Sequence, residues 1–424
     1  MSHEFIDDLI WRGLVHQCTD LERLRARIEQ GPVTVYCGFD PTAASLHVGS
    51  LIPLLALARF QQAGHRVLAL VGGATGLIGD PSGKSAERVL QTEQDVATRA
   101  QGLAGQISRF VDLSDARRGA LVNNLQWTSG QGVLEFLRDV GKHFSVNAMV
   151  ARDSVRSRLE REGEGISFTE FSYMLLQAQD FLRLHERQGC QLQIGGSDQW
   201  GNMCSGVDLI RRVRAQDAFA MTFPLLTTRD GQKFGKTVKG AVWLDEQLTC
   251  AWDFFQFWLN AEDADVVRFL KLFTFVPRAE IEQLEAVTRE APHERRAQRR
   301  LAVELTTWVH GPQAAADMEA VAAALFGKSC VSQLSATAMD SLSRSLPCAD
   351  STQVTADTRV AAALVALGIE PSMSRANEAL RAGAVQLNGT RLAGPAALLK
   401  DVPALHGRFW LLRKGKKTFG MVRH

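Results

Sequence analysis

The sequence predicts an α/β protein built around a doubly wound parallel sheet. Over the first 240 residues, short apolar runs of strand length alternate with longer segments that have helical apolar spacing. Glycine-rich loops follow several of the apolar runs. Helical crossovers join parallel strands and cover both faces of such a sheet. The alternation therefore favours a Rossmann-like arrangement, in which ligands bind at the carboxyl ends of the strands.

The expected elements follow one another in a regular order. The first segment, 4–29, has mixed charge and helical spacing. Five apolar runs have strand length: Val33–Gly38, Val67–Val71, Leu121–Leu125, Gln191–Ile194 and Phe223–Leu226. Helical spacing covers the segments between and beside these runs, at 47–62, 86–110, 131–140, 166–183 and 199–213.

We expect four parts along the chain. Residues 1–240 form the α/β domain, and residues 241–326 form an α-helical domain anchored by aromatic side chains. Residues 327–352 are rich in Ser, Ala and Thr, which is typical of a linker. Residues 353–424 form a compact module with a net charge of +7, against −5 for the remainder. A basic terminal module suggests a polyanionic partner, and a solvated basic surface explains the charge equally well.

Composition excludes several classes of protein. The 424 residues include 48 basic and 46 acidic side chains, and 46% of the chain is hydrophobic, which excludes disordered, fibrous and membrane-spanning proteins. The seven cysteines are scattered and form no C-x-x-C pair, so we expect neither a disulfide framework nor a structural zinc site. The first residues, MSHEFIDDL, lack the pattern of a signal peptide. We therefore expect a cytoplasmic protein.

Tyrosine is almost absent from the chain, although aromatic residues in general are not. There are 21 Phe and 8 Trp but only 2 Tyr, which are Tyr36 and Tyr173. A chain that keeps aromatic rings while losing phenolic hydroxyls suggests that the two remaining tyrosines do more than pack.

The glycine-rich segment 76–85 is similar to a phosphate-binding P-loop, but its spacing is wrong. Counting back from Gly83-Lys84-Ser85, the required glycine falls on Ile78, and Gly79 is one residue too close. What remains is a glycine-rich turn after an apolar run, carrying Asp80, Lys84 and Arg88. Such a loop can approach a ligand closely and place charges around it, and a plain strand-to-helix turn is the equally weighted alternative.

The segment 40–50 follows the first apolar run and opens a helix. A helix start offers unpaired N–H groups and the positive end of the helix dipole, which suit the oxygens of a triphosphate. His47 and the small Gly49 permit close approach of a nucleotide. The alternative is that His47 caps the helix and has no further role.

A second charged loop lies at the end of the α/β domain. Lys233, Lys236 and Thr237 surround a glycine and form a cationic loop that can neutralise charge on a departing pyrophosphate. Taken alone, this pattern fits a solvated lysine loop better.

Two polar clusters complete the candidate site. Tyr173, Gln177 and Asp180 have the i, i+4, i+7 spacing that places three hydrogen-bonding side chains on one helix face. Asp198 and Gln199 follow Gly195-Gly196 after an apolar run, an arrangement that fits the recognition of ribose hydroxyls and amides. The alternative is that the polar groups of each cluster only satisfy one another.

In this order, the motifs resemble those of class I aminoacyl-tRNA synthetases and, more narrowly, of bacterial tyrosyl-tRNA synthetases over the whole chain. Four stretches match almost residue for residue: Tyr36–Thr42, Val71–Pro81, Gly141–Asn147 and Ile166–Tyr173. The stretch 374–389 resembles an S4-type RNA-binding fold. The resemblance therefore implies that residues 353–424 are a small α+β S4-like domain that binds RNA.

The resemblance also implies roles for the candidate residues. The phenol of a tyrosine substrate would meet Tyr36 and Asp180, and the remainder of the amino acid would be held by Asp80, Tyr173, Gln177 and Gln199. ATP would be contacted by Cys37, Thr42, His47, Gly49, Lys84, Arg88, Asp198 and Lys236. The catalytic groups would be His47, Ser50, Lys233, Lys236 and Thr237. Mg²⁺ would bind through the ATP phosphates, without protein ligands of its own.

The implied reaction has two steps, in which tyrosine and ATP first give tyrosyl-adenylate and pyrophosphate. The tyrosyl group then passes to the terminal adenosine of tRNA(Tyr). Because no protein nucleophile is needed, positioning and charge stabilisation would carry the catalysis. The resemblance further implies a homodimer, with no membrane or DNA partner.

The chain departs from the family pattern at one position. The family motif His-x-Gly-His has Ser50 in place of its second histidine. Two alternatives follow from the sequence: a tryptophanyl-tRNA synthetase, and a catalytically weakened paralogue that acts as an RNA-binding or regulatory protein. The C-terminal module and Asp180 argue against the first alternative, and the complete tyrosine pocket argues against the second.

Overall fold

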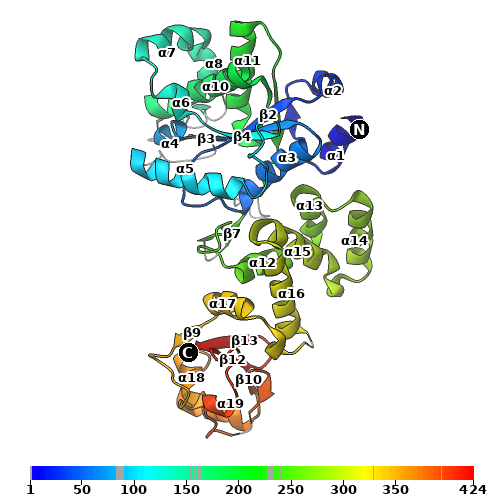
Figure 1. The fold of residues 1–424 in the computed structure, drawn as a ribbon, viewed down its shortest axis with the longest axis vertical. Coiled ribbons are helices and arrows are strands. Elements are labelled where there is room, and N and C mark those ends of the chain that lie inside the picture. The colour runs from blue at the N-terminus through cyan, green and yellow to red at the C-terminus, as the bar shows by residue number, and fades with distance from the viewer. Residues whose placement is uncertain are drawn as a thin grey trace. The chain divides into compact units, whose positions relative to one another are not determined.

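The computed structural model describes residues 2–82, 90–152, 155–156, 159–160, 165–226, 234–237, 240–327, 329–392 and 394–424 (Figure 1). The chain divides into two compact units. The first comprises Met1–Asp245 and Val267–Glu282, and the second comprises Glu246–Val266 and Gln283–His424.

A six-stranded sheet forms the centre of the first unit. Its order is β1-β6-β5-β2-β3-β4, and all neighbours are parallel except β1, which pairs antiparallel with β6 at one edge. The chain runs outward from β2 to β4 on one side and from β5 to β6 on the other. This confirms the predicted doubly wound sheet and places its switch point between β2 and β5. The strands are β1 (Gln17–Cys18), β2 (Thr34–Phe39), β3 (Arg66–Val71), β4 (Gly119–Asn123), β5 (Cys190–Gly196) and β6 (Phe219–Phe223).

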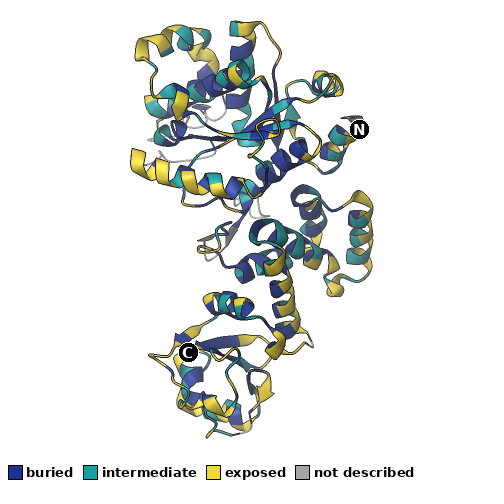
Figure 2. Ribbon diagram, viewed as in Figure 1, coloured by how far each residue is buried: buried dark blue, intermediate teal, exposed yellow. Residues whose placement is uncertain are grey.

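Helices cover both faces of this sheet. Figure 1 shows α3 (Leu51–Gln62) and α5 (Glu93–Ile107) on one side and α10 (Phe168–Gln188) and α11 (Trp200–Arg214) on the other. Strands β3 and β6 are almost wholly buried, and four of the six residues of β2 are buried, because both faces of these strands lie against helices. Figure 2 shows buried residues at the centre of the first unit and exposed residues on its outer helices. Three short helices lie beside α10: α6 (Leu125–Thr128), α7 (Val133–Asp139) and α8 (Val146–Val150).

The N-terminal segment differs from the sequence prediction. The single helix expected over 4–29 is two helices, α1 (Ser2–Trp11) and α2 (Leu21–Glu29), separated by β1. The backbone of this interval pairs with β6, and the side chain of Asp20 caps α2 by accepting a hydrogen bond from the Arg23 N–H. Pairing at the sheet edge and a helix cap therefore interrupt the helical pattern.

Helical structure continues in the segment after the sheet. The second unit contains α12 (Ala251–Leu259), α15 (Arg296–His310) and α16 (Pro312–Phe326), while α13 (Asp263–Phe273) and α14 (Arg278–Glu290) each contribute residues to both units. In the first unit, Arg12 donates hydrogen bonds to the carbonyls of Thr274 and Val276 at 3.1 and 3.0 Å. Arg59 donates to the same Thr274 carbonyl. These two buried guanidinium groups hold residues 274–276 against α1 and α3.

The C-terminal part of the second unit is an α+β domain, as predicted. Its five-stranded sheet has the order β11-β10-β12-β13-β9, and α18 (Val360–Ala366) and α19 (Met373–Arg381) share a buried apolar cluster with it. The strands are β9 (Cys348–Asp350), β10 (Val385–Leu387), β11 (Thr390–Arg391), β12 (Phe409–Lys414) and β13 (Thr418–Arg423).

The interval 327–352, which we expected to be a linker, contains regular structure. Helix α17 (Ala336–Ser345) begins at a Ser335 cap and buries Ala338, Met339 and Leu342 completely. Strand β9 then pairs with β13 in the C-terminal sheet. The small residues that suggested a linker instead belong to a short amphipathic helix, whose apolar side is covered.

Candidate active site

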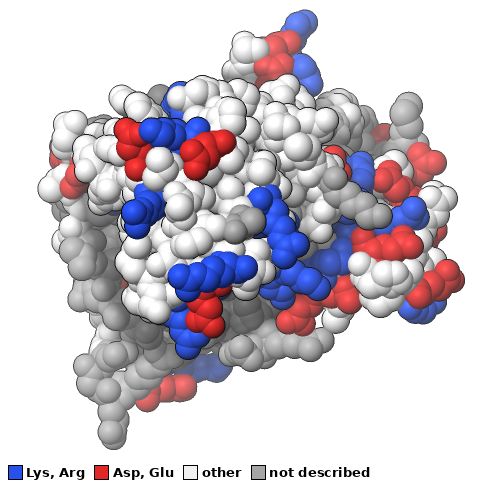
Figure 3. Space-filling model, turned by 90° about the horizontal axis from the view of Figure 1, so that it is seen from below, with Lys and Arg blue, Asp and Glu red and all other residues white. Residues whose placement is uncertain are grey.

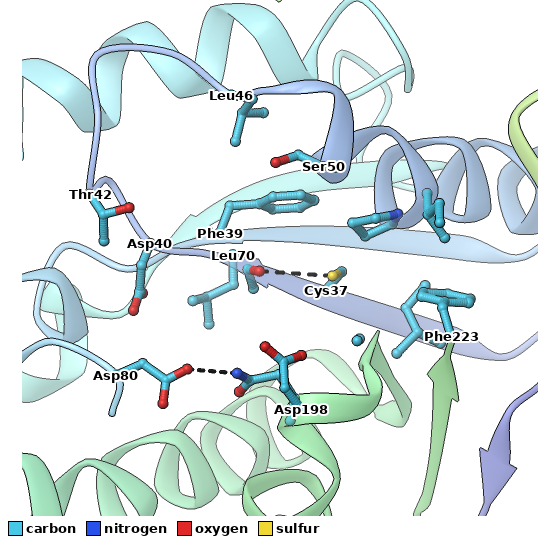
Figure 4. A pocket seen from close by; sticks show the side chains of 18 of the residues that line it. Cys37, Phe39, Asp40, Thr42, Leu46, Ser50, Leu70, Asp80, Asp198 and Phe223 are labelled. Carbon is cyan, nitrogen blue, oxygen red and sulfur yellow. Dashed lines mark hydrogen bonds between the residues drawn. The ribbon is translucent and has the colours of Figure 1, made fainter. Parts of the chain in front are cut away.

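A cavity of about 580 Å³ opens at the carboxyl ends of β2 and β5, at the switch point of the sheet. Its walls come from these two strands, the segment 40–50, the loop that contains Asp80, and helix α10. Figure 4 shows Leu46 and Ser50 on one side of this cavity and Asp80 and Asp198 on the opposite side. The predicted residues from four separate stretches of sequence therefore line one space.

Tyr36 and Asp180 lie together at the buried end of the cavity. Asp180 is 4% exposed, and its carboxylate accepts hydrogen bonds from Trp127 Nε1 at 2.8 Å and Asn124 Nδ2 at 2.9 Å. Burial raises the pKa of Asp180 to about 7, although both hydrogen bonds act in the opposite direction. Tyr36 is 1% exposed, and its hydroxyl has no hydrogen-bond partner among the described residues.

Burial also keeps the Tyr36 hydroxyl protonated. Its pKa is raised well above the usual value, first by burial and then by the charge of Asp180. A buried phenol that lacks a partner carries a desolvation cost of about 1–3 kcal/mol. The pair thus offers one donor and one acceptor to a ligand hydroxyl.

A second set of hydrogen-bonded polar side chains contains Asp40, Tyr173 and Asp80. The Tyr173 hydroxyl donates to Asp40 Oδ2 at 2.7 Å, and burial raises its pKa well above the usual value, assisted by the charges of Asp40 and Asp80. Gln199 Nε2 donates to Asp80 Oδ2 at 2.6 Å. Asn202 Nδ2 donates one hydrogen bond to Gln177 Oε1 at 2.9 Å and another to Gln199 Oε1 at 3.3 Å. Carboxylates with hydroxyl and amide oxygens form a suitable environment for an ammonium group.

The segment that contains His47 begins the helix α3 as predicted. His47 Nδ1 accepts a hydrogen bond from the Gly49 N–H at 2.9 Å, so the proton of a neutral ring lies on Nε2. A Cβ at position 49 would lie 2.6 Å from the His47 ring, which explains the glycine. Ser50 ends the short 3₁₀ helix Val48–Ser50 and lines the cavity. Cys37 on β2 also lines the cavity, and burial raises the pKa of its thiol to about 12.

The segment that contains His47 and the loop that contains Lys236 meet at Gly235. Its φ is +87°, and a Cβ there would overlap Val48 Cγ2 in the His47 segment. The Val48 N–H donates to the Val242 carbonyl at 2.9 Å, and His47 forms an antiparallel bridge with Trp243. The loop that follows β6 is thus attached to the start of α3.

Not all predicted site residues can be placed. Lys84, Arg88 and Lys233 lie outside the described residues. The backbones of Lys236 and Thr237 form β7 (Lys236–Thr237), which pairs with β8 (Gly240–Ala241), but their side chains also lie outside the description. Thr42 and Asp198 line the cavity as expected. Among the residues that are described, no cluster of His, Cys, Asp and Glu is suited to holding a metal ion.

Comparison with known proteins shows the family. Residues 28–327 match the family model of class I tRNA synthetases (W and Y), and residues 340–422 match the SYY-like C-terminal domain of tyrosine–tRNA ligase. The chain belongs to the class I tRNA synthetases of the tryptophan and tyrosine group. This confirms the resemblance inferred from the motifs.

Two relatives within this synthetase group match the chain over nearly its full length. The tyrosine–tRNA ligase of Kineococcus radiotolerans is 51% identical over 98% of this chain and 97% of its own. The ligase of Geobacillus kaustophilus is 48% identical over 99% of this chain and 100% of its own. These relatives support the tyrosine-activating interpretation and not the weakened paralogue.

Solved structures of class I synthetases show the same fold. The C-terminally truncated mitochondrial tyrosyl-tRNA synthetase of Aspergillus nidulans is 33% identical, with a TM-score of 0.69 over 76% of this chain and 94% of that one. A tryptophanyl-tRNA synthetase of Encephalitozoon cuniculi is 15% identical, with a TM-score of 0.55, and shares the fold alone.

Sequence reasoning missed several residues of this synthetase site. Asp40, Thr75, Asn124 and Trp127 complete its hydrogen bonds, and Gln193 lines the cavity with its Oε1 atom buried and unpaired within the described chain. Asp40 and Asn124 directly follow β2 and β4, so their position at carboxyl ends of strands was a usable signal. Trp127 has no comparable signal in the sequence, because it lies in the short helix α6 rather than at the end of a strand.

In the described part of the chain, no helix is long and apolar enough to cross a membrane.

Proposed function

We propose that this chain is a tyrosine–tRNA ligase, which activates tyrosine with ATP and transfers the tyrosyl group to tRNA(Tyr). The observation that carries the proposal is the unpaired Tyr36 hydroxyl beside Asp180 at the buried end of the cavity. A phenol donates its proton to Asp180 and accepts from Tyr36, so both groups are satisfied at once.

The same pair supplies the specificity. Phenylalanine has no hydroxyl, so it would leave buried polar groups unpaired and its binding would lose their contribution. This effect is best known from tyrosyl-tRNA synthetases themselves, and it needs no editing reaction. Tryptophan places its indole N–H differently and cannot accept from Tyr36.

At the other end of the amino acid, we assign the ammonium group to Asp80, Tyr173 and Gln177. Because Tyr173 donates its proton to Asp40, its oxygen lone pairs remain available to an ammonium N–H. Gln199 is held by Asp80 and Asn202 and would contact the carboxyl end of the substrate. The carboxylate is thereby directed toward the side of the cavity where ATP would bind.

Activation would then follow by positioning. The tyrosine carboxylate attacks the α-phosphorus of ATP, and pyrophosphate leaves with its charge neutralised by protein cations. The Nε2–H of His47 serves as a donor to phosphate oxygens at the start of α3. Mg²⁺ on the phosphates would supply further charge neutralisation. The residues that we place around ATP and its reacting phosphates are Cys37, Thr42, His47, Gly49, Ser50, Lys84, Arg88, Asp198, Lys233, Lys236 and Thr237.

We assign tRNA(Tyr) binding in part to the C-terminal domain. Its exposed cations include Arg375, Arg381, Arg391, Lys416 and Lys417. Figure 3, seen from below, shows Lys and Arg side chains close together and interspersed with acidic groups. Lys and Arg on an exposed surface attract the phosphates of RNA, so the affinity for tRNA should fall as the salt concentration rises.

A homodimer is supported by an exposed apolar surface on the first unit. Leu134 is 83% exposed and Phe168 is 78% exposed, and Val133 and Val146 are also largely exposed. These residues lie on α7, α8 and the start of α10, which are neighbours in Figure 1. Large exposed apolar side chains on neighbouring helices are typical of a protein interface. We therefore place the dimer contact on this surface.

The proposed activity has a direct test. We expect the purified protein to exchange pyrophosphate into ATP in the presence of tyrosine, and not in the presence of tryptophan. Exchange with tryptophan, or none with tyrosine, would contradict the proposal. Tyr36→Phe is the matched variant: it should lower the preference for tyrosine over phenylalanine about tenfold or more, because only one hydroxyl is removed.

A further inference from the structure

The two ends of the proposed tyrosine site are joined by a continuous chain of hydrogen bonds. Asn124 Nδ2 donates to Asp180 Oδ2 at 2.9 Å and to Thr75 Oγ1 at 3.0 Å. Thr75 Oγ1 donates to Asp40 Oδ1 at 2.7 Å, and the Tyr173 hydroxyl donates to Asp40 Oδ2 at 2.7 Å. The chain thus runs from the group that meets the phenol to the group that meets the ammonium.

The orientation of Asn124 is fixed by its third bond. The Ala74 N–H donates to Asn124 Oδ1 at 2.7 Å, and only the oxygen of an amide can accept such a bond. The nitrogen must therefore face Asp180 and Thr75, and each of its two protons has one acceptor. Asn124 is fully buried, so no water is available to replace either partner.

The hydroxyl of Thr75 links Asn124 to Asp40. Its hydroxyl has a single proton, and it accepts from Asn124 while donating to Asp40. Thr75 is 3% exposed, so its hydroxyl depends on these two partners. If Asn124 turned, the Thr75 hydroxyl would lose its donor, and Asp40 and Tyr173 would readjust.

We propose that Asn124 and Thr75 are positioning residues that couple the two ends of the tyrosine site. When a phenol occupies Asp180, the chain is fixed and Tyr173 is aligned for the ammonium group. When phenylalanine occupies the site, the Tyr36 hydroxyl remains unpaired and Asp180 lacks the phenol as a donor, and the chain readjusts as far as Tyr173. This inference rests on the proposed function, and it adds that phenol recognition controls the alignment of the reacting end of the amino acid.

A thermodynamic cycle measures this coupling. The phenol end is varied through the ligand, by comparing the Kd of tyrosine with the inhibition constant of phenylalanine against tyrosine-dependent exchange. The ammonium end is varied through the protein, with Tyr173→Phe. In the native background, we expect the cost of losing the Tyr173 hydroxyl to differ between the two ligands by roughly three- to thirtyfold, as in other contiguous networks. The coupling ratio is the cost of Tyr173→Phe for tyrosine divided by its cost for phenylalanine. In the Thr75→Val background, this ratio should fall to within about twofold of unity.

Two control variants separate coupling from structural damage. Thr75→Ser retains the hydroxyl and should retain the native ratio. Thr222→Val removes another fully buried threonine hydroxyl, on β6, which has no hydrogen-bond partner within the described structure. It should also leave the ratio unchanged. If Thr75→Val does not fold, Thr75→Ala lacks the hydroxyl without the added volume, and the expectation for it is the same.

The possible results are distinct. A native ratio of unity, or an unchanged ratio in Thr75→Val or Thr75→Ala, would overturn the coupling while leaving the enzyme a tyrosine–tRNA ligase. Loss of coupling in Thr222→Val as well would also overturn it, because the effect would then not depend on the chain. Failure of the native protein to catalyse tyrosine-dependent exchange would instead overturn the proposed function.

Discussion

At the scale of single residues, the site depends on where burial leaves polar groups unpaired. Tyr36 and Asp180 are both almost completely buried, yet the Tyr36 hydroxyl finds no partner in the described chain. The only two tyrosines of the sequence, Tyr36 and Tyr173, both line the cavity. We propose that their hydroxyls take part in ligand recognition, for which a phenylalanine side chain at either position would lack the hydroxyl.

Asp180 should make tyrosine binding depend on pH. Its pKa of about 7 is raised from 3.8, so its charge is lost as pH falls through 7, and an uncharged carboxyl accepts the phenol proton less strongly. We expect the affinity for tyrosine, measured by equilibrium dialysis, to fall about three- to tenfold between pH 8 and pH 6. The Asp180→Asn protein should bind tyrosine weakly and without this dependence. A flat profile for the native protein would count against a role for the Asp180 charge.

At the scale of elements, the start of α3 shows how local structure serves chemistry. The segment that contains His47 offers backbone N–H groups at a helix start, and Gly49 allows its own N–H to reach the His47 ring. The backbone of the loop after β6 is held against this segment by Val48 and Gly235. The two motifs that we place around the phosphates therefore form one local unit, although almost 190 residues separate them.

Ser50 is the member of this unit that departs from the family. It lines the cavity, but its hydroxyl is shorter than an imidazole and cannot reach as far. We expect Ser50→His to raise the rate of tyrosyl-adenylate formation about two- to tenfold, with the Kd of tyrosine unchanged, because one donor is gained in the transition state. Rapid-quench measurement with Ser50→Ala as the control tests this. Equal rates for the native and Ser50→His proteins would show that position 50 does not act on the reacting phosphates.

At the scale of the whole molecule, the exposed apolar side chains of α7, α8 and α10 decide the oligomeric state that we propose. Burying Leu134 and Phe168 against a second copy would remove them from water, at roughly 25 cal/mol for each Å² of apolar surface. Leu134→Glu should shift the protein toward monomers in mass photometry at nanomolar concentration. Leu248→Glu is the matched control, since Leu248 is 51% exposed and lies in the second unit. If Leu134→Glu left the dimer unchanged, the interface would have to lie on another surface.

The sequence by itself determined the alternation of strands and helices around the central sheet, and it named a minority of the residues that line the cavity, mainly polar ones. The spacing of apolar residues and the length of each run distinguish a buried strand from an amphipathic helix. In a parallel sheet, the residues that bind ligands follow the carboxyl ends of the strands. The same patterns failed at 327–352, where a short helix and an edge strand lie in a stretch rich in small residues. There the deciding contacts come from elements far away in sequence, such as β13.

Only the tertiary structure decided which polar groups form hydrogen bonds with one another and which are left without a partner in the described chain. Asp40, Thr75, Asn124 and Asp180 lie on four separate segments, and no local pattern shows that they form one chain of hydrogen bonds. The unpaired Tyr36 hydroxyl likewise becomes visible only when every neighbour has been placed. Hydrogen bonds are short and directional, so the fold, rather than the composition, determines them.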